Sequence, residues 1–307
     1  MIYTVTPNPA IDRLLYLSHP LEKRKTNRAD QVAYDIGGKG THGSYAMTQL
    51  SVPNQALGFA GEKNWAELEE ILEQRGIPHL FFLVPDQHTR QSIVIIEPDN
   101  RGTTMLTEPS LLVSQAEKSQ LLNYLQHHLT AKDMLLIAGS LPGHFELEDL
   151  EQLLLLAREK GSFVACDLSG EALRRAVSIG VDFIKPNEFE LGELLAARVG
   201  QPKMTLKDLT QKVTCVVASK GDEGSICYYA GKQYLVKAPI VREVNDTGAG
   251  DCFVGAFLAS FYEEKNIEKA LRTGSACAAS KVQHQDSSYF DLTQVEQLLH
   301  QVEITVI

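Results

Sequence analysis

The residues with the clearest chemical potential lie in the stretch VNDTGAGDCFVGAFLASFY, residues 244–262. Three small residues, Gly248, Ala249 and Gly250, precede Asp251, and an apolar segment typical of a buried helix follows. Glycines let backbone N–H groups approach a ligand closely, and the N-terminus of a helix favours negative charge. The stretch therefore predicts an anion hole for a phosphoryl group, with Asp251 accepting a proton from a hydroxyl nucleophile. The alternative is that Asp251 only caps the helix.

A second glycine-rich turn, GGKG at residues 37–40, carries the single cation Lys39. It is not a Walker A loop, because no serine or threonine follows the lysine at the end of a G-x-x-x-x-G-K motif. Lys39 could contact a sugar hydroxyl or a phosphate. The alternative is an ordinary surface turn.

The segment KPNEFE places Lys185 and Asn187 at the end of a predicted strand, with Glu190 one helical turn after Asn187. Residues three apart share a helix face, so the amide and the carboxylate can point at one site. Such oxygen donors suit a hydrated Mg²⁺ beside phosphates. The alternative is a helix cap with its carboxylate in solvent.

The segment SKGDEG, residues 219–224, predicts a tight turn after a strand, which either cradles nucleotide phosphates or only reverses the chain. The sequence lacks the motifs of a dinucleotide-binding site and of a serine nucleophile. No G-x-G-x-x-G follows the first strand, and there is no G-x-S-x-G nucleophile elbow. The nine histidines show no metal-ligand spacing, so we interpret them as mostly surface or packing residues.

The elements that must position these motifs alternate regularly through the second half of the chain. Apolar strands are predicted at 133–139, 162–168, 181–187 and 213–219, and amphipathic helices at 147–161, 170–180 and 188–200. This alternation predicts a three-layer α/β/α domain around a mostly parallel sheet. Ligands of such sheets bind beyond the carboxyl ends of the strands, where the motifs fall.

The N-terminal third is less regular. A strand is predicted at 2–6, another at 55–62, a helix at 64–76, and a hairpin at 89–106 that turns through residues 98–102. Segments of about 12–35 and 86–107 are predicted to pair as a small inserted β lid. We expect residues 1–307 to form a single domain with this lid, whose exposed face could join two copies in a homodimer.

The amino-acid composition limits the classes of molecule that the protein is expected to bind. The formal net charge is −10 and no long basic run exists, which argues against nucleic acid and anionic membranes as partners. Five scattered cysteines without C-x-x-C spacing fit a reducing compartment. The N-terminus does not resemble a signal peptide, and no apolar run is long enough to cross a bilayer. A cytoplasmic protein with small-molecule ligands is the prediction.

The motifs in this order resemble the ribokinase/phosphofructokinase-B family of carbohydrate kinases along essentially the whole chain. The resemblance rests on TPNPAID, GGKG, SGEAL, KPNEFEL and NDTGAGDCFVGAF. The segments TVTPNPAIDR, TNRAD, TRQSI and CDLSGEAL are most similar to the branch of 1-phosphofructokinases and tagatose-6-phosphate kinases. That branch phosphorylates sugar phosphates with ATP and Mg²⁺.

The resemblance implies a role for each matching residue. Asp251 would be the catalytic base, and the amides of Gly248, Ala249 and Gly250 the anion hole. The nucleotide and Mg²⁺ would be held by Lys185, Asn187, Ser219, Gly221 and Gly224, with Glu190 on the metal through water. The sugar would be held by Asp12, Gly38 and Lys39, and the phosphate that it already carries by Arg28 and Arg90.

Residues 41–45, THGSY, depart from the branch pattern, which continues GGKG with I-N-V-S-R. A substrate-contacting asparagine is accordingly expected to be missing at position 43, and His42 could replace a polar contact. Residues 246, 247 and 252 are closer to general sugar and nucleoside kinases.

The predicted activity is ATP-dependent phosphorylation of fructose 1-phosphate or tagatose 6-phosphate at a primary hydroxyl, giving a sugar bisphosphate. One alternative is a kinase for an unphosphorylated sugar or nucleoside. Another is a non-catalytic sensor of nucleotide or sugar phosphate, although a sensor needs no base.

Overall fold

The computed structural model describes residues 1–98, 103–197 and 203–307. Within these residues the chain forms a ten-stranded sheet and a separate four-stranded sheet. The predicted turn at 98–102 falls almost wholly outside the described residues. No helix of the described part of the chain is both long and apolar enough to span a membrane.

The large sheet is mostly parallel. From one edge to the other it contains β14 (Glu303–Val306), β13 (Lys232–Lys237), β12 (Ser225–Tyr229), β11 (Cys215–Ser219), β10 (Phe183–Ile184), β9 (Phe163–Asp167), β8 (Met134–Ala138), β1 (Ile2–Thr6), β4 (Asn54–Gly61) and β5 (His79–Val84). The strands from β11 to β5 are parallel, whereas β12, β13 and β14 add an antiparallel edge. The carboxyl ends of the parallel strands therefore share one edge of the sheet.

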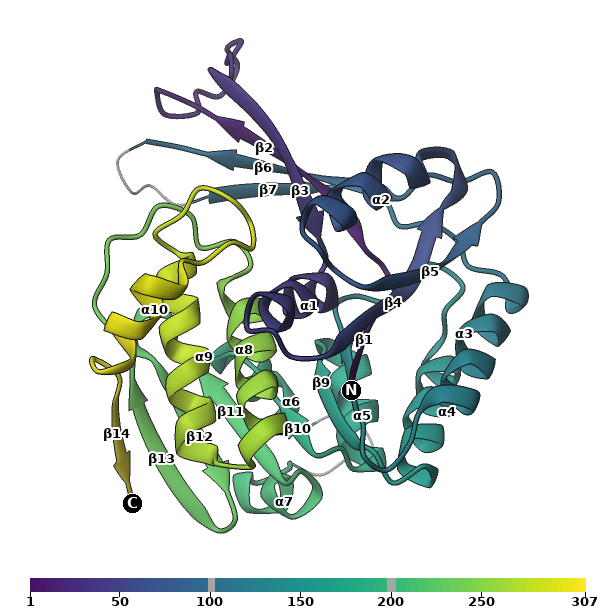
Figure 1. Cartoon of the computed structure of the whole chain (residues 1–307), viewed down its shortest axis with the longest axis vertical. Helices are drawn as coiled ribbons and strands as arrows, with labels where there is room; N and C mark the ends of the chain where they lie inside the picture. Colours follow the sequence, from purple (N-terminus) through teal and green to yellow (C-terminus); the bar gives the residue numbers. More distant parts are fainter. Residues whose placement is uncertain (99–102, 198–202) are drawn as a thin grey trace.

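Helices cover both faces of this sheet (Figure 1). The helices are α1 (Lys39–Gln49), α2 (Trp65–Gln74), α3 (Gln115–His128), α4 (Leu147–Glu159), α5 (Gly170–Ile179), α6 (Glu188–Leu195), α7 (Leu206–Lys212), α8 (Ala249–Glu264), α9 (Ile267–Lys281) and α10 (Leu292–Leu299). Alternate residues of β8 divide between the two faces: Leu136 belongs to the apolar cluster that includes residues of α1, α8, α9 and α10, and Leu135 to the cluster that includes residues of α3, α4 and α5. The predicted three-layer α/β/α fold is confirmed.

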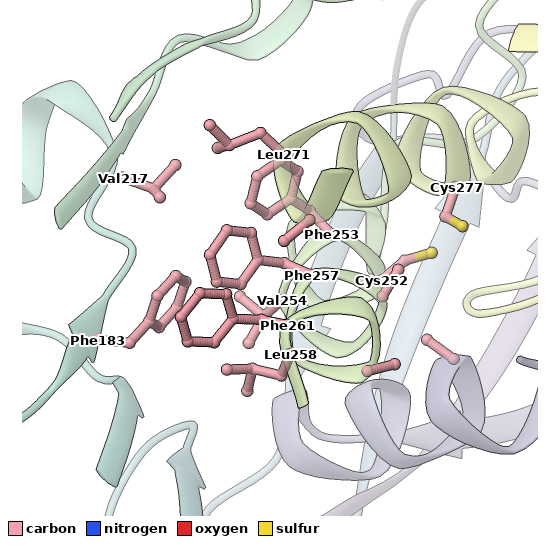
Figure 2. Packing of buried hydrophobic residues seen from close by; sticks show 14 of the residues in the cluster. Phe183, Val217, Cys252, Phe253, Val254, Phe257, Leu258, Phe261, Leu271 and Cys277 are labelled. Atoms are coloured by element: carbon pink, nitrogen blue, oxygen red, sulfur yellow. The ribbon is translucent and has the colours of Figure 1, made fainter. Parts of the chain in front are cut away.

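Helix α8 is fixed to the sheet by a ladder of aromatic rings one helical turn apart (Figure 2). The rings of Phe253, Phe257 and Phe261 stack at centroid distances of 6.0 and 5.8 Å. Phe257 also packs 4.8 Å from Phe183 of β10. Burial of an aromatic side chain is worth about 2–3 kcal/mol, so this face anchors the helix whose first turn carries Asp251.

The four-stranded sheet is the structure's lid. Its strands are ordered β3 (Gln31–Gly37), β2 (Ala10–Tyr16), β6 (Arg90–Ile96) and β7 (Thr103–Thr107), and it projects beyond the carboxyl-end edge of the large sheet (Figure 1). The four strands overlap or adjoin the segments predicted for the lid, and β6 and β7 pair antiparallel as predicted for the hairpin. The description of the whole chain as a single domain stays a prediction.

Two predicted elements differ from the structure. Strand β10 is limited to Phe183–Ile184, because Pro186 has no N–H to donate to a ladder. Helix α6 ends at Leu195, and the last residues of its predicted range lie outside the described residues. The antiparallel strands β12 to β14 are not predicted from the sequence, since their apolar pattern is short and irregular.

Candidate active site

The first turn of α8 forms the floor of the candidate site. Gly248 is the N-cap residue, with a φ of 76° that only glycine adopts at little cost, and an added Cβ would lie 2.0 Å from the carbonyl oxygen of Ser287. The Ala249 N–H donates to the Asp246 carbonyl at 3.1 Å. The N–H groups of Gly250 and Asp251 have no hydrogen-bond partner within the described residues. Two helix N-terminal amides are thus free to receive an anion.

Asp251 is paired with His42, one turn into α1. The Nδ1 atom of His42 lies 2.8 Å from Oδ2 of Asp251, and only 4% of the His42 side chain is exposed. Burial raises the pKa of the Asp251 carboxyl, but the hydrogen bond and charge of His42, with the charges of Lys39 and Lys185, lower it below its usual value. Asp251 is therefore ionised, as a proton acceptor must be.

Two lysines flank this carboxylate. Lys39 opens α1 and donates to Oδ1 of Asp167 at 3.0 Å. Burial lowers the pKa of Lys39, but Asp167, Asp251 and Glu190 raise it above its usual value. Lys185 follows β10, and its Nζ would lie 3.2 Å from a Cβ added to Gly250. Both cations can therefore stabilise negative charge that develops near the start of α8.

The pairing of α1 with α8 depends on two glycines. A Cβ added to Gly255 would lie 2.4 Å from the Gly43 carbonyl oxygen and 2.8 Å from the Cβ of Ala46. The expectation of a missing substrate contact at position 43 is wrong, because Gly43 lies in this helix crossing. The position that faces the site is 42, which is also where the asparagine of I-N-V-S-R falls when counted from Gly40.

Asp12 lies on the inner face of the lid. The Asp12 residue is 2% exposed, and its Oδ2 is 3.8 Å from Nε2 of His42. Burial raises the pKa of Asp12 to about 6, even though His42 opposes the shift. Gly37 leaves room for this carboxylate, because a Cβ there would meet Oδ1 of Asp12 at 2.3 Å. Gly38, the N-cap of α1, has a φ of 108°, and Lys39 follows it at the start of α1. Asp12 therefore lies beside Gly37, the residue next to the other two predicted sugar ligands in the chain.

The residues predicted for the nucleotide adjoin one another at the neighbouring strand ends. Asn187 and Ser219 form a backbone bridge, and the Ser219 N–H donates to the Pro186 carbonyl at 3.0 Å. Gly221 and Gly224 follow with φ values of 61° and 100°. The loops after β10 and β11 thus lie side by side.

Asn187 and Glu190 also form the helix cap that the sequence left as an alternative. Oδ1 of Asn187 accepts from the Glu190 N–H at 2.8 Å, and Oε2 of Glu190 accepts from the Asn187 N–H at 3.0 Å. Within the described residues, no group of three or more His, Cys, Asp or Glu side chains could hold a metal ion directly. A metal here would be held by phosphates and water, with Glu190 beyond the water, which suits Mg²⁺.

The two predicted phosphate ligands are not brought together. Arg90 is half-buried beside Asn8 and Pro9, donating to their carbonyl oxygens at 3.1 and 3.3 Å. It pairs with Ala10 at the start of β2, whereas Arg28 lies in the loop beyond Tyr16 at the other end of that strand. At about 3.3 Å per residue this places them on the order of 20 Å apart. The expectation that both arginines of one chain grip one phosphate is therefore not met.

One residue and one contact of the site were not predicted from the sequence. Asp167 is the last residue of β9, in the segment CDLSG. Its position at the end of a predicted strand is the sequence feature that could have identified it as a site residue. The direct contact between His42 and Asp251 had no local signal beyond the departure from I-N-V-S-R, because the two residues are 209 positions apart.

The fold and the site define a class: an α/β phosphotransferase with a lid, an acid at a helix N-terminus and flanking cations. The chain belongs to the pfkB family of carbohydrate kinases, whose family match covers residues 6–294.

Individual relatives match along nearly the whole chain. It is 26% identical to a tagatose-6-phosphate kinase of Staphylococcus epidermidis over 316 residues, and 27% identical to a 1-phosphofructokinase of Bacillus subtilis over 312 residues, with 99% of each chain covered in both cases. A crystal structure of phosphofructokinase-2 from Escherichia coli in complex with substrates and products superposes with a TM-score of 0.87 at 25% identity, covering 98% of each chain.

Proposed function

We propose that this carbohydrate kinase transfers the γ-phosphoryl group of ATP to a primary hydroxyl of a ketohexose phosphate, fructose 1-phosphate or tagatose 6-phosphate, giving a sugar bisphosphate. The observation that carries the proposal is the ionised carboxylate of Asp251 beside two amides at the start of α8 that have no partner among the described residues. The named relatives support a sugar phosphate as acceptor, since two are kinases of such substrates and E. coli phosphofructokinase-2 has been crystallised with fructose 6-phosphate.

In the proposed reaction Asp251 takes the proton of the acceptor hydroxyl. The oxygen then forms a bond to the γ-phosphorus while the bond from that phosphorus to the bridging oxygen breaks, and ADP leaves with the electron pair. The amides of Gly250 and Asp251, with Lys185 and Lys39, stabilise charge on the phosphoryl oxygens. The remaining rate acceleration comes from positioning of the two substrates between the lid and the strand ends, where water is excluded.

Nucleotide and metal are assigned to the neighbouring loops. Asn187, Ser219, Gly221 and Gly224 would line the nucleotide phosphates, and Glu190 would reach Mg²⁺ through water. When bound, Mg²⁺ neutralises charge on the phosphate oxygens.

The sugar is assigned to Asp12, Gly38 and Lys39. Arg90 is the proposed ligand of the existing phosphate, because it lies on the same face of the lid as Asp12 and its guanidinium can pair with a phosphate in bidentate fashion. Arg28 stays a predicted phosphate ligand that a variant must test separately.

The first test is ADP release with MgATP against fructose 1-phosphate, tagatose 6-phosphate, fructose 6-phosphate, free fructose and ribose. We expect turnover with one of the first two acceptors. Turnover with free sugars alone would reject the phosphate site at Arg90 and keep the base. Stoichiometric binding of these ligands without turnover would instead identify a sensor.

We also propose that the lid joins two copies of the chain. Val32 and Tyr34 on β3 and Leu106 on β7 lie on the lid face opposite Asp12 and are 44, 54 and 56% exposed, so this face presents large apolar side chains to solvent. Among the relatives, E. coli phosphofructokinase-2 has a tetrameric inhibited form. Light scattering should give a dimer that Tyr34→Glu and Leu106→Glu dissociate, while Leu155→Glu on α4 leaves it intact. A monomeric wild-type chain would refute this assembly. The cytoplasmic location stays a prediction.

A further inference from the structure

We propose that His42 is a positioning residue for the base: a doubly protonated imidazolium that holds one oxygen of Asp251 and leaves the other for the acceptor hydroxyl. The catalytic consequence rests on the proposed role of Asp251, whereas the charge state of the ring rests on its own geometry. A histidine at this place is not implied by the resemblance, whose branch pattern has asparagine there.

Both ring nitrogens of His42 face oxygen atoms that accept hydrogen bonds. Nε2 lies 2.8 Å from the carbonyl oxygen of Ile36, which can only accept, so Nε2 carries a proton. Nδ1 lies 2.8 Å from Oδ2 of Asp251. One further proton lies between Nδ1 and Oδ2. It is bonded either to the ring, which is then an imidazolium, or to Asp251, which is then a neutral carboxylic acid.

The surrounding charges assign that proton to the ring. Three carboxylates from three elements act on it: Asp251 of α8, Asp12 of β2 and Asp35 of β3. Burial lowers the pKa of His42, but the hydrogen bond and charge of Asp251, followed by the charges of Asp12 and Asp35, raise it to about 9. Because the pKa of Asp251 is shifted downward, the pair is an imidazolium and a carboxylate.

The free oxygen of Asp251 is the one available for catalysis. Its Oδ1 has no hydrogen-bond partner within the described residues, and 14% of the side chain is exposed. The ring cannot turn away without breaking its bond to Ile36, and the close approach of α1 and α8 at Gly43 and Gly255 keeps it against Asp251. The direction of Oδ1 is therefore fixed before substrate arrives.

The charge state is tested directly by ¹⁵N NMR of the histidine side chains in the full chain. The signal that disappears in His42→Asn identifies His42. At pH 7.5 we expect both of its nitrogens to be protonated, with loss of the proton near pH 9. A spectrum with one protonated and one bare nitrogen would overturn the proposal. In Asp251→Asn the ring should lose its proton at lower pH than in the wild type.

The positioning role is tested by kinetics of His42→Asn, which keeps one polar contact but removes the charge. We expect kcat to fall about 10- to 100-fold, the scale of a misplaced reacting group, with a smaller change in KM. The acidic limb of the kcat profile should move to higher pH, because Asp251 loses the cation that lowers its pKa. We also expect wild-type activity to decline as the pH rises through about 9, where His42 loses its proton, and this decline should be absent in His42→Asn.

His127→Gln is the matched control, since His127 is exposed on α3 and its one hydrogen bond within the described part of the chain is with the Asn123 carbonyl. A His42→Asn enzyme with wild-type kcat and an unmoved acidic limb would overturn the inference while leaving the proposed kinase intact. Retained turnover in Asp251→Asn would instead reject the base, and the NMR experiment would still decide the charge of His42. Circular dichroism of each variant separates these results from misfolding.

Discussion

The two ends of the site differ in how completely their charges are paired. At the helix end, His42 pairs with Asp251 and Lys39 with Asp167, and all four side chains are wholly or partly buried. At the lid end, and among the described residues, the Arg90 guanidinium donates hydrogen bonds only to backbone carbonyls, and the exposed Arg28 has no hydrogen-bond or ion-pair partner.

This difference indicates that the charges at the helix end are paired when the protein folds, whereas those at the lid end are paired when a ligand binds. Buried charges are costly unless paired, so the helix end must be assembled when the core forms. Arginines that are exposed or bonded only to carbonyl oxygens are not neutralised by a carboxylate, so they can still bind a phosphate. We therefore expect changes at the helix end to affect kcat and changes at the lid end to affect KM.

The largest effect is expected for Asp251→Asn. Loss of a general base reduces kcat about 10²- to 10⁴-fold, with little change in sugar affinity. Steady-state kinetics with the acceptor identified by the substrate panel measures this. Near-normal turnover would show that Asp251 is not the base. It would also contradict the expectation that changes at the helix end affect kcat.

Arg90→Gln should have the next largest effect, at the opposite end. A charge-assisted bond to phosphate contributes about 1.5–3 kcal/mol, which corresponds to a loss of about 10- to 100-fold in kcat/KM. The loss should appear mainly in KM for the sugar phosphate. Arg28→Gln in parallel tests the remaining predicted ligand, and an equal loss in both variants would show that two distant arginines serve one phosphate.

Gly255→Ala tests whether helix contact maintains the helix end. The new methyl group would meet the Gly43 carbonyl, and overpacking of this kind costs about 1–3 kcal/mol. Gly192→Ala on α6 is the control, because its Cβ would meet nothing within 4 Å and alanine favours helix by about 0.5–1 kcal/mol. Chemical denaturation of both variants checks this, and equal stabilities would disprove tight packing at the crossing.

A further effect is expected in the pH dependence of the free energy of unfolding. The folded-state pKa of His42 is about 9, above its ordinary value of 6.5, so its contribution is complete below about pH 6.5 and is lost as the pH rises through 9. The free energy of unfolding of the wild type should therefore converge on that of His42→Asn over this range. A constant difference between the two would mean that the ring does not titrate.

Local patterns were sufficient for the regular part of the fold. The strands β8, β9 and β11 and the helices α4 and α5 were predictable because apolar periodicity specifies an element and its buried faces. The lid strands and the antiparallel edge were harder, since half-buried short strands carry weak patterns. The motifs at the strand ends were found because parallel strands place their carboxyl ends at one edge.

By itself, the sequence determined the alternation of strands and helices, the family, and the place of Asp251 at a helix N-terminus. These depend on residues close together in the chain. Only the tertiary structure decided that His42 meets Asp251, that Lys39 meets Asp167 across 128 positions, and that Arg28 and Arg90 stand at opposite ends of a strand. The physical reason is that helix crossings and strand register set these distances, and no local pattern of residue types records them.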